Sequence, residues 1–184
     1  GGSVANPMVM ASGEAMIGLS QGIFLTAAME GTDPYTEKVD ILRGIASLDS
    51  TLLYLVCDAS VEENTVGELI ENGTTVSIGT LPAGNAADML MDLVFQEYGV
   101  TAEEISGGSV YVADGSALTD AYSDRHFDLV TLNRALPNAS LTEIMSGRDS
   151  KILGIEEDIA QALADKYDWE IITIPAGTYP GQDE

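Results

Sequence analysis

From Thr74 onward, short apolar stretches alternate with longer stretches of helical periodicity. This alternation constrains the fold more than any other feature of the chain, because it is typical of a mostly parallel sheet with helices on both faces. The sequence therefore predicts an α/β fold. Strands are expected at 74–79, 109–113, 127–132, 151–155 and 170–174, and helices at 86–98, 116–122, 138–145 and 156–167.

The first unit of this alternation, residues 74–99, reads as a strand, a loop of small residues and a helix. Asn85 is expected to cap the helix and Gly99 to end it. A loop at a helix N-terminus can present N–H donors to an anionic or carbonyl ligand. The loop matches neither the dinucleotide-binding fingerprint nor the P-loop. A plain connection that binds nothing is the alternative interpretation.

Three loops are expected at one edge of the sheet, where the parallel strands end. They span 80–85, 114–116 and 133–138. Ligands of open α/β sheets bind beyond the carboxyl ends of the strands, so this edge is the predicted binding region. Arg134 lies in the third loop, where it is either a ligand contact or a solvated charge.

The first part of the chain does not complete a domain by itself. Helices are expected at 6–12, with Asn6 as the cap, and at 23–30; strands are expected at 15–20, 42–48 and 51–57. A short helix is expected at 66–71. We therefore predict two lobes, one complete and one incomplete.

Charge and composition limit the possible functions. The chain has 30 acidic and 7 basic residues and a net charge of −23, so nucleic acids and anionic membrane surfaces are poor partners. No apolar run approaches a membrane span, so no direct membrane insertion is expected. Cys57 is the single cysteine and is predicted to be buried, and His126 is the single histidine. No catalytic residue, metal site or cofactor is expected.

The segment 174–184, Ile-Pro-Ala-Gly-Thr-Tyr-Pro-Gly-Gln-Asp-Glu, closely resembles a signature of the TAXI family of TRAP-transporter solute receptors. Weaker similarities follow in the same order along the chain. They are Gly1-Gly2-Ser3-Val4-Ala5-Asn6, Gly13-Glu14-Ala15 with Gly18 and Gln21, Ala46-Ser47-Leu48 with the apolar residues 53–56, Val76-Ser77-Ile78-Gly79 with Gly84, and Pro137-Asn138-Ala139.

The resemblance implies a type II periplasmic-binding-protein fold in which two lobes close on a solute. Residues 1–54 and 171–184 would form a partial first lobe with hinge strands, and residues 55–170 the second. The implied ligand is a small carboxylate such as glutamate, glutamine or a dicarboxylate. The implied partners are the permease subunits of a TRAP transporter, and the implied location is periplasmic or extracytoplasmic. Together with Arg134, the residues expected to face the ligand are Gln21, Thr80, Ala83, Gly84, Asn85, Asn133 and Pro137.

Some features depart from the family pattern. The family's first strand would precede Gly1 and further elements would follow Glu184, so we expect the chain to be truncated at both ends. Ala83 and Asn85 stand where hydroxyl residues are usual. A receptor-like sensor or interaction domain is the first alternative function. An enzyme on the same fold, with Asp114 or Asp120 as a base, is the second.

Overall fold

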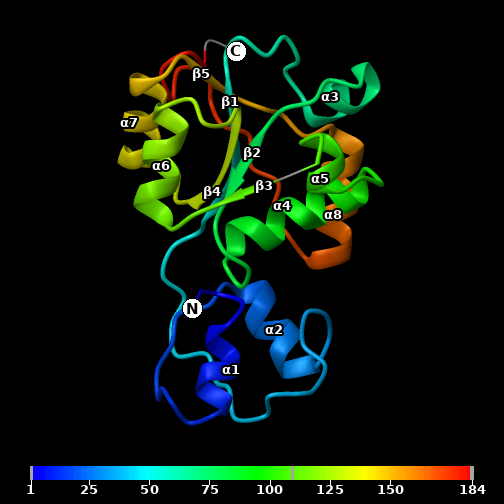
Figure 1. Cartoon of the computed structure of the whole chain (residues 1–184). Helices are drawn as coiled ribbons and strands as arrows, with labels where there is room; N and C mark the ends of the chain where they lie inside the picture. The colour runs from blue at the N-terminus through cyan, green and yellow to red at the C-terminus, as the bar shows by residue number, and fades with distance from the viewer. Residues whose placement is uncertain (1, 109, 183–184) are drawn as a thin grey trace.

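In the computed structural model, which describes residues 2–108 and 110–182, a helix-flanked sheet lies above a small helical part (Figure 1). The described residues form five strands: β1 Leu52–Asp58, β2 Ile78–Thr80, β3 Val110–Val112, β4 Leu129–Arg134 and β5 Ser150–Ile152. They also form eight helices: α1 Asn6–Ala11, α2 Gly22–Glu30, α3 Val66–Asn72, α4 Ala86–Glu97, α5 Ala102–Ile105, α6 Gly115–Ser123, α7 Ala139–Gly147 and α8 Glu157–Tyr167.

The strand order is β3-β2-β4-β1-β5, and β1 alone runs against the other strands. The predicted α/β class with a mostly parallel sheet is confirmed. Because β2 is parallel to both β3 and β4, their carboxyl ends meet at one edge, as expected. In the antiparallel pair, Leu52 lies opposite Arg134, so β1 begins where β4 ends. The linker that enters β1 therefore reaches the same edge.

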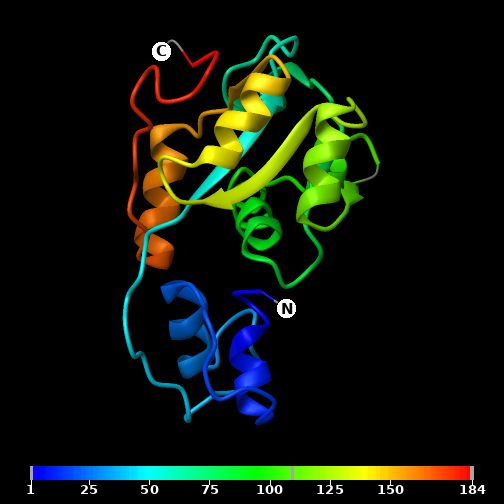
Figure 2. The same cartoon turned by 90° about the vertical axis from the view of Figure 1, so that its left-hand side faces the viewer.

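The two faces of the sheet carry separate cores, and β1 contributes to both. Tyr54 and Val56 belong to the core under α6 and α7, whereas Leu55 and Cys57 belong to the core under α3, α4, α5 and α8. This alternation follows from the two-residue period of a strand. Figure 2 shows the sheet from the side of α6 and α7. Cys57 is buried, as predicted, and its burial raises the pKa of the thiol to about 12.

Two of the three predicted helix N-caps are confirmed, and the third is not. Asn85 accepts a hydrogen bond from the Ala87 N–H at 3.0 Å, and Asn138 accepts one from the Leu141 N–H at 3.3 Å. The prediction for Asn6 was wrong: its amide donates to the Leu19 carbonyl at 2.7 Å, and the helix is preceded by Ala5. This contact ties α1 to the segment that leads toward α2.

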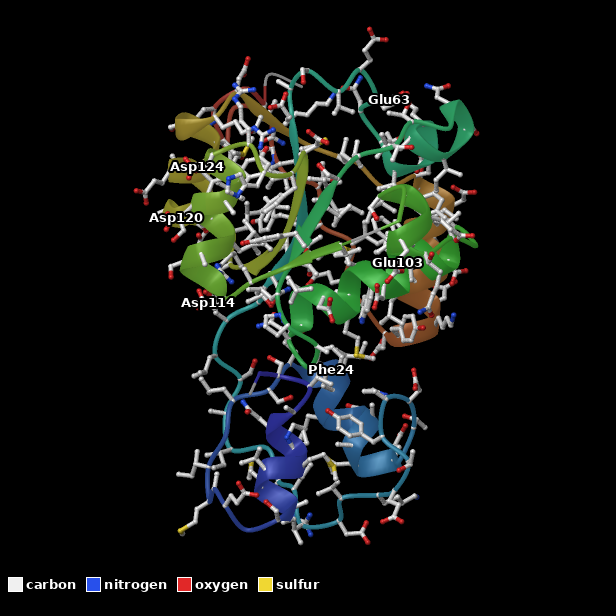
Figure 3. All side chains as sticks on the ribbon, viewed as in Figure 1. Phe24, Glu63, Glu103, Asp114, Asp120 and Asp124 are labelled. Carbon is white, nitrogen blue, oxygen red and sulfur yellow. The ribbon has the colours of Figure 1, made fainter. Side chains whose placement is uncertain are left out.

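The small helical part, α1 and α2 with the loop after them, packs against the N-terminal half of α4. Phe24 of α2 lies in a cluster with Tyr35, and this cluster includes Ala86 and Leu90 of α4. Figure 3 labels Phe24 between the two parts of the molecule. None of the described helices is long and apolar enough to cross a membrane.

Three expected strands, at 15–20, 42–48 and 170–174, are not strands in the structure. Among the described residues, no neighbouring strand pairs with these segments. Most of their apolar side chains face solvent, although Leu42 is buried in the cluster with Phe24 and Ile174 packs against the core under α6 and α7. Met16 is 93% exposed, Ile45 is 81% exposed and Ile171 is 50% exposed. A β-branched, apolar composition was therefore not enough to form a strand, because a strand also needs a neighbouring strand to pair with. The strand expected over 109–113 appears as β3, and Ser109 lies outside the described residues.

Candidate ligand-binding cleft

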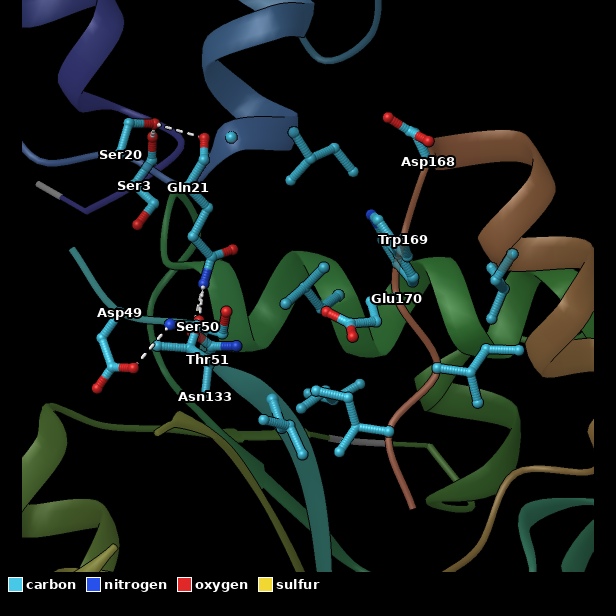
Figure 4. Close-up of a pocket in the computed structure, with 18 of the residues that line it drawn as sticks. Ser3, Ser20, Gln21, Asp49, Ser50, Thr51, Asn133, Asp168, Trp169 and Glu170 are labelled. Carbon is cyan, nitrogen blue, oxygen red and sulfur yellow. Dashed lines mark hydrogen bonds between the residues drawn. The ribbon is translucent and has the colours of Figure 1, made fainter. Parts of the chain in front are cut away.

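A cleft of about 2200 Å³ separates the small helical part from the sheet (Figure 4). Its walls come mainly from three chain segments, two of which include the start of α2 and the start of β1, and from helices α4 and α8. The segments lie at 17–25, 42–53 and 168–174. Of the three loops predicted to bind the ligand, only 133–138 contributes to this lining, through Asn133.

One side-chain bridge spans the cleft. Gln21 stands immediately before α2, and its amide donates to the Thr51 hydroxyl at 2.8 Å and to the Asn133 side-chain oxygen. Gln21 and Asn133 were both predicted as site residues, and the structure brings them together (Figure 4). The Asn133 amide nitrogen is buried and has no hydrogen-bond partner among the described residues. It is therefore a buried donor without a partner, on a residue that lines the cleft.

Two polar residues of this site were missed by the sequence analysis. Thr51 lies beside Asn133 because β1 is antiparallel to β4, an orientation that strand propensity does not reveal. Ser20 precedes Gln21, and its hydroxyl donates to the Ser3 carbonyl at 2.7 Å. The polar pair Ser20-Gln21 before an apolar helix was the available signal.

The loop 80–85 has fewer polar groups free to contact a ligand than the sequence predicted. The Thr80 hydroxyl is buried and accepts a hydrogen bond from Thr131 at 2.9 Å, and the Asn85 side-chain oxygen is used as the helix cap. Gly84 has a φ of +89°. Gly2 packs on this loop so closely that a Cβ there would lie 2.6 Å from the Gly84 carbonyl oxygen. Ala83 is exposed. These four residues stay predictions as ligand contacts.

Arg134 does not join the Gln21–Asn133 pair. It follows Asn133 on β4, so strand alternation directs it toward the opposite face of the sheet. There it lines a second cavity of about 340 Å³ between α6 and α7. Pro137 is exposed in the loop before α7. The structure therefore divides the predicted site residues between two places.

The large cleft is acidic. Its lining includes four carboxylates and two basic side chains, namely Asp49, Glu157, Asp168, Glu170, Arg43 and Lys151. An anionic ligand in this cleft would depend on uncharged donors such as the amides of Gln21 and Asn133. Carboxylates are also spread over the rest of the surface (Figure 3).

Within residues 2–108 and 110–182, no group of three or more His, Cys, Asp or Glu side chains is arranged to hold a metal ion.

A half-buried carboxylate on α4 predicts a pH effect. Burial, with the charges of Asp88 and Glu103, raises the pKa of Asp92 to about 6. The ionised group therefore destabilises the fold at pH values above 6, and this cost disappears as the pH falls toward the unfolded pKa near 4.

We expect Asp92→Asn to raise the free energy of unfolding by about 1–2 kcal/mol at pH 8 and by much less at pH 4.5. Urea unfolding at both pH values measures the difference. Asp120→Asn, on the exposed side of α6, is the control. An equal effect of Asp92→Asn at the two pH values would contradict the assignment.

Comparison with known proteins gives one match over the whole chain. The model of the NMT1-like family matches residues 1–184. Among curated proteins, no sequence matches the chain.

Proposed function

The chain belongs to the NMT1-like family, a family of periplasmic-binding-protein-like solute receptors, and from this premise we propose that it is the receptor of a TRAP-type secondary transporter. In this proposal the receptor captures a small carboxylate, such as glutamate, glutamine or a dicarboxylate, outside the cytoplasm. It then delivers the solute to the permease subunits of the transporter. The resemblance of residues 174–184 to the TAXI signature supports this finer identification.

The Gln21 bridge carries the proposal. Its amide joins the small helical part to Thr51 and Asn133 at the sheet edge, and all three residues line the cleft. A ligand with a carboxylate or amide group can replace this protein–protein contact with hydrogen bonds to both sides. The unpartnered Asn133 nitrogen would then donate to the ligand.

In the proposed mechanism, the two lobes close on the solute. Residues 1–54 and 171–184 would belong to one lobe and residues 55–170 to the other, with the linker before β1 as a hinge. The ligand favours the closed state only by the hydrogen bonds that it makes in that state and not in the open one. No bond is broken, so the mechanism needs no acid–base pair.

Thermal unfolding with a panel of solutes tests the proposal. The panel contains glutamate, glutamine, 2-oxoglutarate, succinate and fumarate. A ligand present at about 100 times its Kd adds about 2.7 kcal/mol to the free energy of unfolding, which raises the Tm. We expect one solute to raise the Tm of the protein, and Gln21→Glu to abolish the shift because an acceptor and a charge replace the amide donor.

Gln96→Glu, on the exposed face of α4, adds the same charge outside the cleft and serves as the control. The proposal fails if no small carboxylate binds saturably. It also fails if Gln21→Glu and Gln96→Glu leave the same ligand-induced shift.

A further inference from the structure

The cavity between α6, α7 and the end of β4 is separate from the cleft. It has a volume of about 340 Å³ and combines one arginine and three hydroxyl side chains with an apolar floor. Its lining residues are Gly115, Ser116, Thr119, Leu132, Arg134, Ser140, Leu141 and Ile144. We propose that this cavity binds a short-chain monocarboxylate, with the carboxylate on Arg134 and the hydrocarbon on the apolar floor.

Arg134 is the anchor of the proposed site. Among the described residues, no carboxylate lies within ion-pair distance of Arg134, although the sequence has 30 acidic residues and 7 basic ones. Its guanidinium donates to the Asn133 carbonyl at 2.8 Å. Since a guanidinium carries five N–H donors, several remain for a ligand, and its planar fork matches the two oxygens of a carboxylate.

The other walls select the rest of the ligand. Of the three hydroxyls, that of Ser140 donates to no acceptor in the part of the chain that the structure describes, so it can donate to a carboxylate oxygen. The hydroxyls of Ser116 and Thr119 instead donate to Asp114 and the Gly115 carbonyl. The floor consists of three buried aliphatic residues, namely Leu132, Leu141 and Ile144. A second carboxylate over this floor would lose its hydration without a partner, which disfavours dicarboxylates.

The loop that joins Arg134 to Ser140 is held at two points by buried tyrosines. Tyr54 donates to the Ala135 carbonyl at 3.3 Å, and the Tyr179 hydroxyl accepts from the Asn138 N–H at 3.0 Å. The two tyrosine hydroxyls also lie 3.2 Å apart, within hydrogen-bonding distance. These contacts fix the spacing of Arg134 and Ser140 before any ligand arrives, and such preorganisation favours binding.

Calorimetric titration with sodium butyrate tests the site, with butanol and succinate as comparison ligands. We expect butyrate to bind the protein, and butanol and succinate to bind this cavity at least about tenfold more weakly. Arg134→Gln should weaken butyrate binding by about tenfold to a hundredfold, the range expected when a charged hydrogen bond is lost. Arg43→Gln removes a positive charge at the cleft instead and should leave butyrate binding unchanged.

A variant that removes a negative charge near the cavity is expected to strengthen butyrate binding. Asp114 caps α6 by accepting from the Ala117 N–H at 3.2 Å, and asparagine caps a helix equally well. Asp114→Asn should therefore keep the fold and tighten butyrate binding, because it removes a negative charge beside the cavity. Unfolding curves of each variant confirm that the protein remains folded.

The inference is independent of the proposed function, and the titration separates the two. Gln21→Glu alters the cleft and should not affect butyrate binding. Absence of butyrate binding to the folded protein would overturn the inference, as would equal butyrate affinity of the protein and Arg134→Gln. A loss of butyrate binding in Gln21→Glu with none in Arg134→Gln would assign the ligand to the cleft and also overturn it.

Discussion

Replacing Arg148 by methionine is expected to lower the free energy of unfolding by about 3–5 kcal/mol, the cost of leaving one member of a buried ion pair alone. Arg148 lies between α7 and β5, and its Nε donates to Asp58 at 2.7 Å. The same guanidinium donates to the carbonyls of Tyr122 and Phe127, each at 2.7 Å. It also lies over the Tyr122 ring, 4.2 Å from the centroid. Methionine retains much of the side-chain volume but satisfies none of these acceptors.

The pKa of Asp58 gives a second test of the same pair. Burial acts to raise this pKa, but hydrogen bonds from Ser60 and Arg148 outweigh burial and lower it to about 2. A depressed pKa means that the carboxylate contributes stability above the unfolded pKa near 4, and that this contribution is lost as the pH falls from 4 to 2. The Arg148→Met variant should therefore lose less stability than the parent protein across this pH range.

A matched control comes from the second arginine near Asp58. Arg125 lies 3.5 Å from the same carboxylate, but its side chain is 67% exposed, against 3% for Arg148. Arg125→Met should cost no more than about 1 kcal/mol, as is usual for an exposed ion pair. Urea unfolding at pH 7 measures both variants. Equal costs would show that burial does not determine the strength of this pair.

Much of the main sheet was predictable from local pattern. The alternation after Thr74 predicted the parallel strands β2, β3 and β4, because each strand is short, apolar and followed by an amphipathic helix. Asn85 and Asn138 were predictable as caps because capping depends only on residues within the same helical turn. The burial of Cys57 followed from its position at the end of an apolar run.

Features that depend on distant partners were not predictable in this way. The segments around Ile45 and Ile171 have the composition of strands, but composition does not say whether a neighbouring strand exists. The antiparallel direction of β1 depends on where the chain enters the sheet, so Thr51 was not recognised beside Asn133. The separation of Asn133 from Arg134 was not predicted because the strand was expected to end at residue 132, whereas β4 continues to Arg134 and neighbouring strand residues point to opposite faces.

Replacing Phe24 by alanine is expected to destabilise the small helical part by about 3–5 kcal/mol, the usual cost of truncating a buried phenylalanine. Phe24 is 1% exposed and lies in the cluster that joins α2 to Ala86 and Leu90 of α4. This cluster is small, so few other contacts can replace the lost ones. The cores on the two faces of the sheet do not include Phe24 and should remain intact.

Amide hydrogen exchange measures this effect region by region, because local opening and global unfolding have different free energies. Exchange in α2 should become much faster in Phe24→Ala, whereas exchange in β4 should change little. Met16→Ala, at a side chain that is 93% exposed, should change neither. Equal acceleration in α2 and β4 would contradict separate stability of the small helical part.

The same substitution connects packing with the proposed ligand site. Gln21 stands at the start of α2, so its reach to Thr51 and Asn133 depends on the position of that helix. If the cleft binds the solute through Gln21, Phe24→Ala should weaken ligand binding even though Phe24 itself does not line the cleft. The Tm shift induced by the solute should then decrease in Phe24→Ala and remain unchanged in Met16→Ala. An unchanged shift in both variants would show that ligand binding does not require a fixed α2.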